Sequence, residues 1–140
     1  PIFPYSVKYA SSFYGPFRNA VDSKPKRGDR KSYQMNHKNS VEFIREIEQD
    51  INEGADAVII KPALAYLDII REVKVKFNVP IIAYNVSGEY SMVKAAAQKK
   101  HIDELEIILE IILSMKRAGA DAIISYHSVE VVKYLNKTDV

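Results

Sequence analysis

Short apolar runs and helical patterns of apolar residues alternate along the chain. Mostly apolar runs typical of buried strands occur at residues 2–7, 57–60, 80–84 and 122–125. Apolar residues spaced three or four apart predict helices over residues 41–53, 64–77, 89–98, 103–117 and 128–135. This alternation predicts an α/β fold with a parallel sheet.

A repeated Gly-Ala-Asp sequence indicates which α/β fold this is. It occurs at Gly54 and again at Gly119, each time between a predicted helix and a predicted strand. Such units recur in TIM (β/α)8 barrels, where the turn lies at the bottom and the residue after the strand at the top. We therefore predict roughly four βα units of a TIM barrel, as a single partial domain over residues 1–140. Four parallel strands cannot close a barrel, so the open edges need a missing half or a partner. In the barrel wall we expect burial of Val58, Ile60, Ile82, Ile123 and Ile124.

A long segment, residues 9–38, separates the first predicted strand from the first predicted helix. It contains Gly15, Pro16, Pro25 and Gly28 and is predicted to be a loop. A loop of this length favours an active-site lid over a simple connector.

Composition narrows the class of protein. With 140 residues and 47% hydrophobic residues, the chain is long and apolar enough for one domain with a core. Its formal net charge of +2 is too small to indicate a nucleic-acid partner. The sequence contains no apolar run of about 18 residues, so nothing in it indicates a membrane partner. The absence of cysteine excludes disulfides and thiolate metal sites and fits a reducing cytoplasm. Because the sequence begins at Pro1 inside a strand-like run, we expect a piece of a longer protein. His37, His101 and His127 lack metal-ligand spacing, and surface or helix-end roles are expected for them.

Two lysines stand where an apolar run ends and a loop with Gly or Pro begins. Lys8 ends the first run, and Lys61 ends the second, just before Pro62. A lysine at the carboxyl end of a buried strand points into the mouth of an α/β fold, where active sites are assembled. Burial and a neighbouring cation both lower the pKa of an amine, and only the neutral amine attacks a ketone or aldehyde to form a Schiff base. Two such lysines, with arginines between them, indicate carbonyl chemistry.

Four stretches of the sequence resemble one enzyme family. They are Ser-Val-Lys-Tyr-Ala-Ser-Ser-Phe-Tyr-Gly-Pro-Phe-Arg-Asn-Ala from residue 6, Gly-Asp-Arg-Lys-Ser-Tyr-Gln-Met from residue 28, Ile-Lys-Pro-Ala-Leu-Ala-Tyr-Leu-Asp-Ile from residue 60 and Ala-Tyr-Asn-Val-Ser-Gly-Glu-Tyr from residue 83. Together they resemble the porphobilinogen synthase (5-aminolevulinate dehydratase) family over essentially the whole chain. The resemblance implies the C-terminal half of a TIM-barrel hydro-lyase of tetrapyrrole biosynthesis. Such an enzyme joins two 5-aminolevulinate molecules into porphobilinogen with loss of two waters.

The resemblance also implies a role for particular residues. Lys61 resembles the lysine that binds the first substrate, whose acid chain becomes propionate, and Lys8 resembles the lysine of the second substrate. The lid residues that hold the second substrate's carboxylate are matched by Arg18, Arg30 and Gln34. Guanidinium groups suit that task because their fixed fork meets a carboxylate with two parallel hydrogen bonds. The hydroxyl pair that binds the first substrate's carboxylate is matched by Ser87 and Tyr126.

Metals and assembly enter through the same resemblance. It implies no organic cofactor, an active-site Zn²⁺ or Mg²⁺ held by the half not present here, and a homo-octamer for the full-length protein. Glu46 aligns with a carboxylate that binds an allosteric Mg²⁺ in bacterial-type members. The alternative for Glu46 is a solvated helix residue beside Arg45.

Two other readings stay open from the sequence. Another class I Schiff-base barrel of the aldolase type would share Lys61 but would not need Lys8 with two arginines. A truncated fragment would retain these residues without forming the site. Pro4 has no N–H and fits poorly in a paired central strand, which leaves the geometry of the Lys8 strand open.

Overall fold

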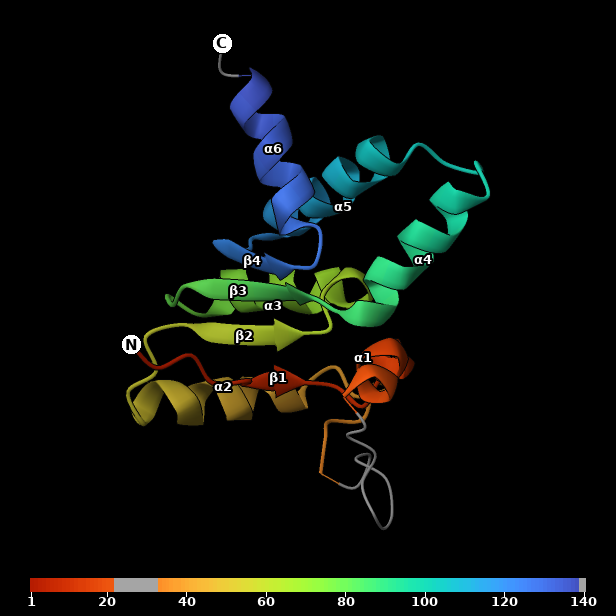
Figure 1. Cartoon of the computed structure of the whole chain (residues 1–140). Helices are drawn as coiled ribbons and strands as arrows, with labels where there is room; N and C mark the ends of the chain where they lie inside the picture. The colour runs from red at the N-terminus through yellow and green to blue at the C-terminus, as the bar shows by residue number, and fades with distance from the viewer. Residues whose placement is uncertain (22–32, 139–140) are drawn as a thin grey trace.

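Four parallel strands form one sheet in the computed structural model, which describes residues 1–21 and 33–138. Their order in the sheet is the order in the chain, as Figure 1 shows: β1 (Val7–Lys8), β2 (Val58–Lys61), β3 (Ile81–Asn85) and β4 (Ala122–Ser125). Every neighbouring pair is parallel. The predicted α/β fold with a parallel sheet is confirmed.

The helices follow the predicted pattern closely. They are α1 (Gly15–Ala20), α2 (Glu42–Asn52), α3 (Leu67–Lys76), α4 (Ser87–Gln98), α5 (Glu104–Ala118) and α6 (Ser128–Thr138), with short 3-10 turns η1 (Ser12–Tyr14) and η3 (Leu64–Tyr66). The two repeat glycines, Gly54 and Gly119, have φ values of 97° and 129°, the left-handed region in which helices commonly end. No helix in the described parts of the chain is long and apolar enough to cross a membrane.

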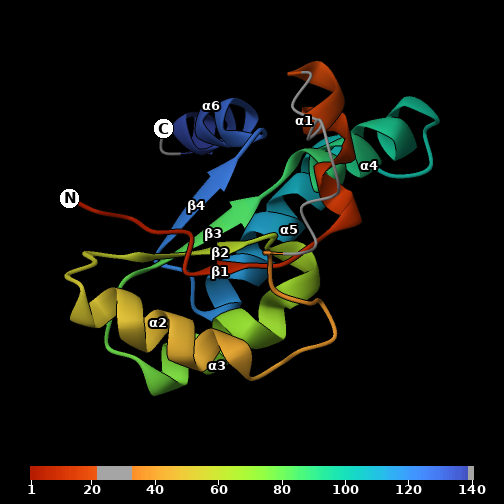
Figure 2. The ribbon, with the colours of Figure 1, turned by 90° about the horizontal axis from the view of Figure 1, so that it is seen from below.

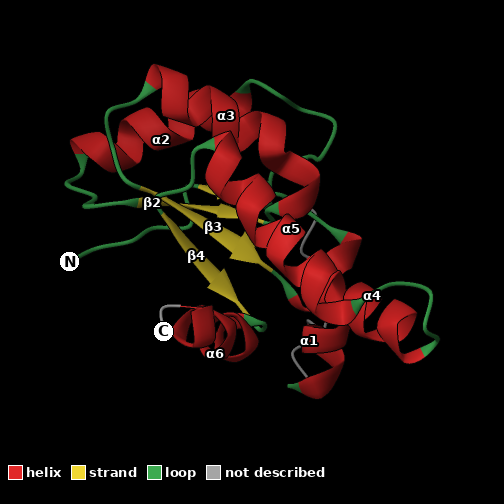
Figure 3. Ribbon diagram, turned by 90° about the horizontal axis from the view of Figure 1, so that it is seen from above, coloured by secondary structure: helices red, strands yellow, loops and turns green. Residues whose placement is uncertain are grey.

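One face of the sheet carries the core. Helices α2, α3 and α5 lie on the same side of the strands, whereas α6 lies on the opposite side (Figures 2 and 3). Fully buried side chains fill the space between the sheet and the three helices: Phe43, Ile47, Val58, Ile60, Ile70, Val73, Ile108 and Met115. The opposite face, which would line the interior of a barrel, has only a small apolar cluster of Ala57, Ile59 and Ile82 with Tyr84 packed against it.

Burial in the predicted barrel wall is only partly as expected. Val58, Ile60 and Ile82 are buried, but Ile123 is half-buried and Ile124 is 40% exposed. The prediction for Ile124 was wrong because β4 is an edge strand and side chains alternate between its two faces. Ile123 packs against the core, which leaves Ile124 on the opposite face of the sheet.

The first strand is shorter than predicted. Residues 2–4 run beside β2, and the Ile2 and Pro4 carbonyls accept hydrogen bonds from Asp56 N and Ile59 N, both at 3.0 Å. Pro4 cannot donate in return, so regular pairing begins only at Val7.

The predicted loop over residues 9–38 is not wholly irregular, because η1 and α1 form within it. Pro16 suits the first turn of α1, where a missing N–H costs nothing. Helix α1 lies near the carboxyl ends of the strands, beside α4 (Figure 1).

Candidate active site at the carboxyl ends of the strands

The two candidate lysines are neighbours in the sheet. Lys8 ends β1, Lys61 ends β2, and the two are register partners. Their amines share the ring of Tyr5, which lies 5.0 Å from Lys8 Nζ and 4.9 Å from Lys61 Nζ. Lys61 Nζ also lies 3.8 Å from the ring centroid of Tyr84 and 5.8 Å from that of Tyr14. Tyrosine rings therefore cover part of the Lys61 side chain, which is half-buried.

This environment makes Lys61 unusually acidic. Burial, and then the positive charge of Lys8, lower the pKa of Lys61 from 10.5 to about 8. A substantial fraction of the amine is thus neutral near physiological pH, as a Schiff-base nucleophile requires.

The same shift predicts a stabilising substitution. Below pH 8 Lys61 is charged in both the folded and the unfolded chain. Only in the folded chain is this charge partly buried, so it destabilises the fold; in the unfolded chain the pKa is the ordinary 10.5. Replacing Lys61 by methionine should therefore raise the free energy of unfolding at pH 7 by about 1–2 kcal/mol, because water around the half-buried side chain screens part of the penalty that the pKa shift implies. The gain should shrink as pH rises from 8 to 10.5, because the unfolded wild type loses its proton more easily as pH approaches 10.5, so that folding costs less deprotonation. Urea unfolding at pH 7 and pH 10 measures it, with exposed Lys99→Met as the matched control. An equal gain at both pH values would show that charge burial is not the cause.

The segment before α1 is pinned to the strand that carries Lys61. The buried Tyr14 hydroxyl lies 3.0 Å from the Tyr9 carbonyl and 3.2 Å from the Lys61 carbonyl, within donating distance of both. Tyr9 N donates to the Lys61 carbonyl at 3.1 Å. Burial raises the pKa of Tyr14, so its hydroxyl remains a donor at neutral pH. The backbone of Lys61 is thereby fixed by the beginning of the predicted lid.

The residues matched to the first substrate meet in one place. Lys61, Ser87 and Tyr126 line a cavity of about 20 Å³ together with Tyr14, Phe17, Tyr84 and Val86. The cavity is small because α1 lies over it: Phe17 N donates to Ser87 Oγ at 3.1 Å, and Ser87 Oγ donates to the Phe13 carbonyl at 3.4 Å. The second of these bonds is long and weak, so the Ser87 hydroxyl can exchange it for a carboxylate at little cost.

The residues matched to the second substrate meet beside Lys8. Arg18 and Gln34 line a second cavity, of about 50 Å³, with both lysines, Tyr14 and Phe17. Arg18 stacks over Tyr14 at 5.3 Å, and the buried Gln34 Oε1 has no hydrogen-bond partner among the described residues. Arg30 lies outside the described residues.

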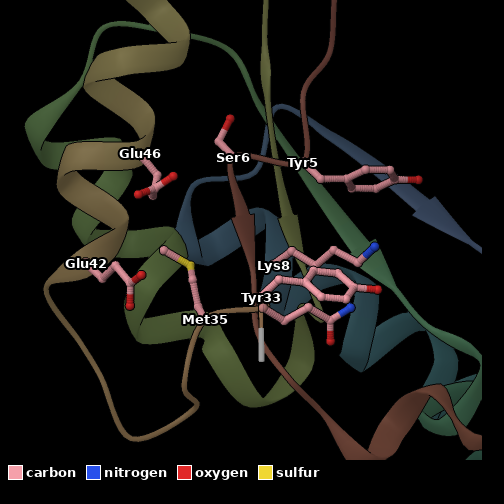
Figure 4. A pocket seen from close by; sticks show the side chains of 8 residues that line it. Tyr5, Ser6, Lys8, Tyr33, Met35, Glu42 and Glu46 are labelled. Atoms are coloured by element: carbon pink, nitrogen blue, oxygen red, sulfur yellow. The ribbon is translucent and has the colours of Figure 1, made fainter. Parts of the chain in front are cut away.

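Glu46 lines a third and larger cavity, which shares Lys8 and Gln34 with the second. This cavity of about 380 Å³ is lined by Tyr5, Ser6, Lys8, Tyr33, Gln34, Met35, Glu42 and Glu46 (Figure 4). Glu46 Oε1 accepts from Arg45 Nη2 at 3.0 Å, in an ion pair exposed enough to contribute little. Glu42, one helical turn away, is the other carboxylate of this cavity, and no group of three or more His, Asp or Glu gathers anywhere in the described part of the chain. The described residues do not by themselves form a magnesium site.

Two buried polar residues near the strand ends did not emerge as functional from the sequence. Glu89, in the first turn of α4, is 1% exposed. It lies three residues after the N-cap of the helix, a position at which a Glu can be recognised in a sequence as a capping residue. His127 is also 1% exposed: it lies at the beginning of α6, one of the two roles expected for it, but it is not at the surface. Its ring packs 4.6 Å from that of Tyr90, and burial lowers its pKa.

Matches with known proteins point to one family. The family model described as Delta-aminolevulinic acid dehydratase matches residues 1–134. The chain is 60% identical over 137 residues to the enzyme of that name from Staphylococcus aureus (strain Mu50), covering 98% of this chain and 42% of the relative. It is also 60% identical over 135 residues to the Bacillus subtilis enzyme of that name, covering 96% of this chain and 42% of the relative. A crystal structure of the Toxoplasma gondii delta-aminolevulinic acid dehydratase (porphobilinogen synthase), in complex with the reaction product porphobilinogen, superposes with a TM-score of 0.90. That match has 52% identity and covers 93% of this chain and 37% of the other. The chain thus spans about two fifths of the length of the relatives it matches.

Proposed function

This chain belongs to the delta-aminolevulinic acid dehydratase family, and we propose that it supplies the Schiff-base part of a porphobilinogen synthase. The observation that carries the proposal is that Lys8 and Lys61 are register partners. Burial of Lys61, and then the charge of Lys8, lower the pKa of Lys61 to about 8. An aldolase-type barrel needs one such lysine, whereas the joining of two keto acids gives each lysine a task.

The chemistry follows from the two groups of residues. The neutral Lys61 amine attacks the ketone carbon of the first 5-aminolevulinate, and loss of water leaves a C=N bond between substrate and enzyme. Ser87 and Tyr126, in the same cavity, bind that substrate's carboxylate. Lys8 binds the second ketone, with its carboxylate held by Arg18, Arg30 and Gln34. Joining the two molecules into porphobilinogen releases two waters overall and returns both lysines to free amines.

Metal, assembly and compartment belong to the same proposal. No organic cofactor is needed for Schiff-base chemistry, and an active-site Zn²⁺ or Mg²⁺ would be held by the part of the relatives that this chain does not span. Glu46 is offered as a contributor to an allosteric Mg²⁺ site that needs ligands besides the described residues. We infer a homo-octamer in the cytoplasm for the whole enzyme.

The chain alone should not turn over substrate. Its sheet ends at β1 and β4, and Ile124, on the face that would line a barrel, is 40% exposed. Open edges of this kind also favour self-association. We therefore expect no porphobilinogen from the purified chain, and turnover from a hybrid enzyme in which the chain replaces the matched segment of the Staphylococcus aureus relative.

The measurement is porphobilinogen formation by the chain and by the hybrid enzyme at equal concentrations. The unmodified Staphylococcus aureus relative is the positive control. Turnover by the monomeric chain would contradict the need for the remaining barrel. A folded hybrid that makes a Schiff base with aldehydes, but no porphobilinogen, would favour the aldolase-type alternative.

A further inference from the structure

A buried carboxylate connects the ends of the strands that carry the first-substrate residues. Glu89 Oε1 accepts a hydrogen bond from Leu64 N at 2.8 Å, in the loop that follows Lys61. Glu89 Oε2 accepts from Val86 N at 2.6 Å and from Asn85 Nδ2 at 3.0 Å, at the end of β3 and directly before Ser87. One side chain thus holds the loop after β2 against the loop after β3.

The connection continues to β4 through Asn85. Ser125 Oγ donates to Asn85 Oδ1 at 2.8 Å, and these two residues are register partners in the sheet. The same Ser125 oxygen accepts from His127 N at 3.1 Å, which fixes the turn that contains Tyr126. Glu89, Asn85 and Ser125 therefore form a chain of hydrogen bonds across β2, β3 and β4, and we call these three residues the strand-end clamp.

Helix capping alone does not account for Glu89. A capping box explains the bond to Val86 N, because the third residue of a helix commonly accepts from the N-cap backbone. It does not explain why the second oxygen reaches the loop after another strand, 25 residues earlier in the chain. Both Glu89 and Asn85 are only 1% exposed, and burial of a carboxylate is costly unless it is fully hydrogen-bonded. Burial raises the pKa of Glu89, and the bonds from Val86, Leu64 and Asn85 act in the opposite direction by favouring the ionised form.

We propose that the strand-end clamp is a positioning device for the first substrate, with Glu89 as its central residue. It sets the spacing between the Lys61 amine and the two hydroxyl groups of Ser87 and Tyr126, one on each of the three clamped segments. The proposal rests on the function proposed above. Lys8 ends β1, which the clamp does not contact through any of these hydrogen bonds, so the second-substrate lysine should be insensitive to the clamp.

Glu89→Gln in the hybrid enzyme tests this. Glutamine keeps the shape, but its amide nitrogen cannot accept, so one of the two clamped loops loses its acceptor. Labelling with 5-aminolevulinate and borohydride, followed by peptide mass mapping, gives separate rates for Lys61 and Lys8. We expect the Lys61 rate to fall about tenfold to a hundredfold, as misplacement by about 1 Å does in active sites, with the Lys8 rate changed less than about twofold. Loss of folded protein would lower both rates together, so the ratio of the two reports positioning.

Two further variants complete the test. Asp103→Ala removes a helix cap far from the clamp, where the Asp103 side chain accepts from Glu106 N at 2.9 Å, and should leave the ratio unchanged. Ser125→Ala should raise the 5-aminolevulinate concentration that half-saturates Lys61 labelling about threefold or more, because it loosens the turn of Tyr126. This variant decides the matter if Glu89→Gln does not fold.

The outcomes separate the two proposals. If the hybrid enzyme without further substitution is labelled at neither Lys61 nor Lys8, the proposed function is overturned, and the proposal of the clamp with it. If the unsubstituted hybrid is labelled at both lysines but the ratio is unchanged in Glu89→Gln, only the proposal of the clamp is overturned. If Glu89→Gln does not fold, an unchanged half-saturating concentration in Ser125→Ala has the same meaning. If Asp103→Ala lowers the ratio of the Lys61 rate to the Lys8 rate as much as Glu89→Gln does, the proposal of the clamp is also overturned. The loss of any helix cap would then be enough to slow labelling at Lys61.

Discussion

Replacing Lys61 by methionine should reduce borohydride trapping of 5-aminolevulinate at this position to background and abolish turnover of the hybrid enzyme. Methionine fills nearly the same space without an amine, so the loss reports the nucleophile and not a cavity. Removing the attacking group of a covalent mechanism costs several orders of magnitude in rate. Peptide mapping after reduction measures the trapping, and Lys99→Met, at an exposed position on the α4 side of the molecule, is the control.

The pH dependence makes this prediction sharper. In the wild type, the rate of labelling at Lys61 should rise with pH and level off above about 8, the pKa set by burial and Lys8. An ordinary lysine would continue to rise to about pH 10.4. Lys8→Met removes the neighbouring charge, so the midpoint at Lys61 should move upward. Label confined to lysines other than Lys8 and Lys61 would refute the assignment of both nucleophiles.

The elements and the lysine positions could be predicted because their signals are local. An apolar run followed by Lys61-Pro62, and a Gly-Ala-Asp turn before each of two strands, are contained within about ten residues of sequence. The observed strand ends agree with them, and Lys8 and Lys61 become register partners. The resemblance to one family added the residues whose meeting depends on the tertiary fold, such as Ser87 and Tyr126, which share a cavity with Lys61.

The parts that sequence reasoning missed depend on contacts between distant residues. The exposure of Ile124 follows from its place on an edge strand and not from its own apolar character. The bond from Leu64 N to Glu89 joins residues 25 apart, and that between Phe17 N and Ser87 joins residues 70 apart. No periodicity in the sequence reports such pairs. Tyr14, whose hydroxyl lies within reach of the Lys61 carbonyl, carries no sequence signal that distinguishes it from the other tyrosines.

Gly88 is the residue on which the seating of the α1 segment depends. A β-carbon added there would lie 2.4 Å from the Phe13 carbonyl oxygen and 2.6 Å from the Phe13 Cα. Both are backbone atoms, which cannot turn aside as a flexible side chain can. Only a residue without a side chain lets η1 approach α4 this closely.

We therefore expect Gly88→Ala to displace η1 and α1 from the strand ends. The change should cost about 1–3 kcal/mol of stability, as overpacking of a close contact does. Its larger effect should be on Lys61, because Tyr14 and Phe17 would no longer shield that amine from water. Its pKa should then move from about 8 back toward 10.5, so that trapping at pH 7 slows and the midpoint of the pH profile rises.

Gly15→Ala is the matched control for this prediction. Gly15 begins α1 with φ −52°, and an added β-carbon there meets no atom within 4 Å. Both variants add one methyl group to the same pair of interacting segments, but only one of them forces the backbones apart. The pH profile of Lys61 labelling in the hybrid enzyme should therefore shift in Gly88→Ala and stay at the wild-type midpoint in Gly15→Ala. If Gly88→Ala folds and its pH profile is not shifted, then the packing of η1 and α1 against α4 does not lower the pKa of Lys61. Burial beneath Tyr5 and Tyr84, and the charge of Lys8, would then remain as the causes.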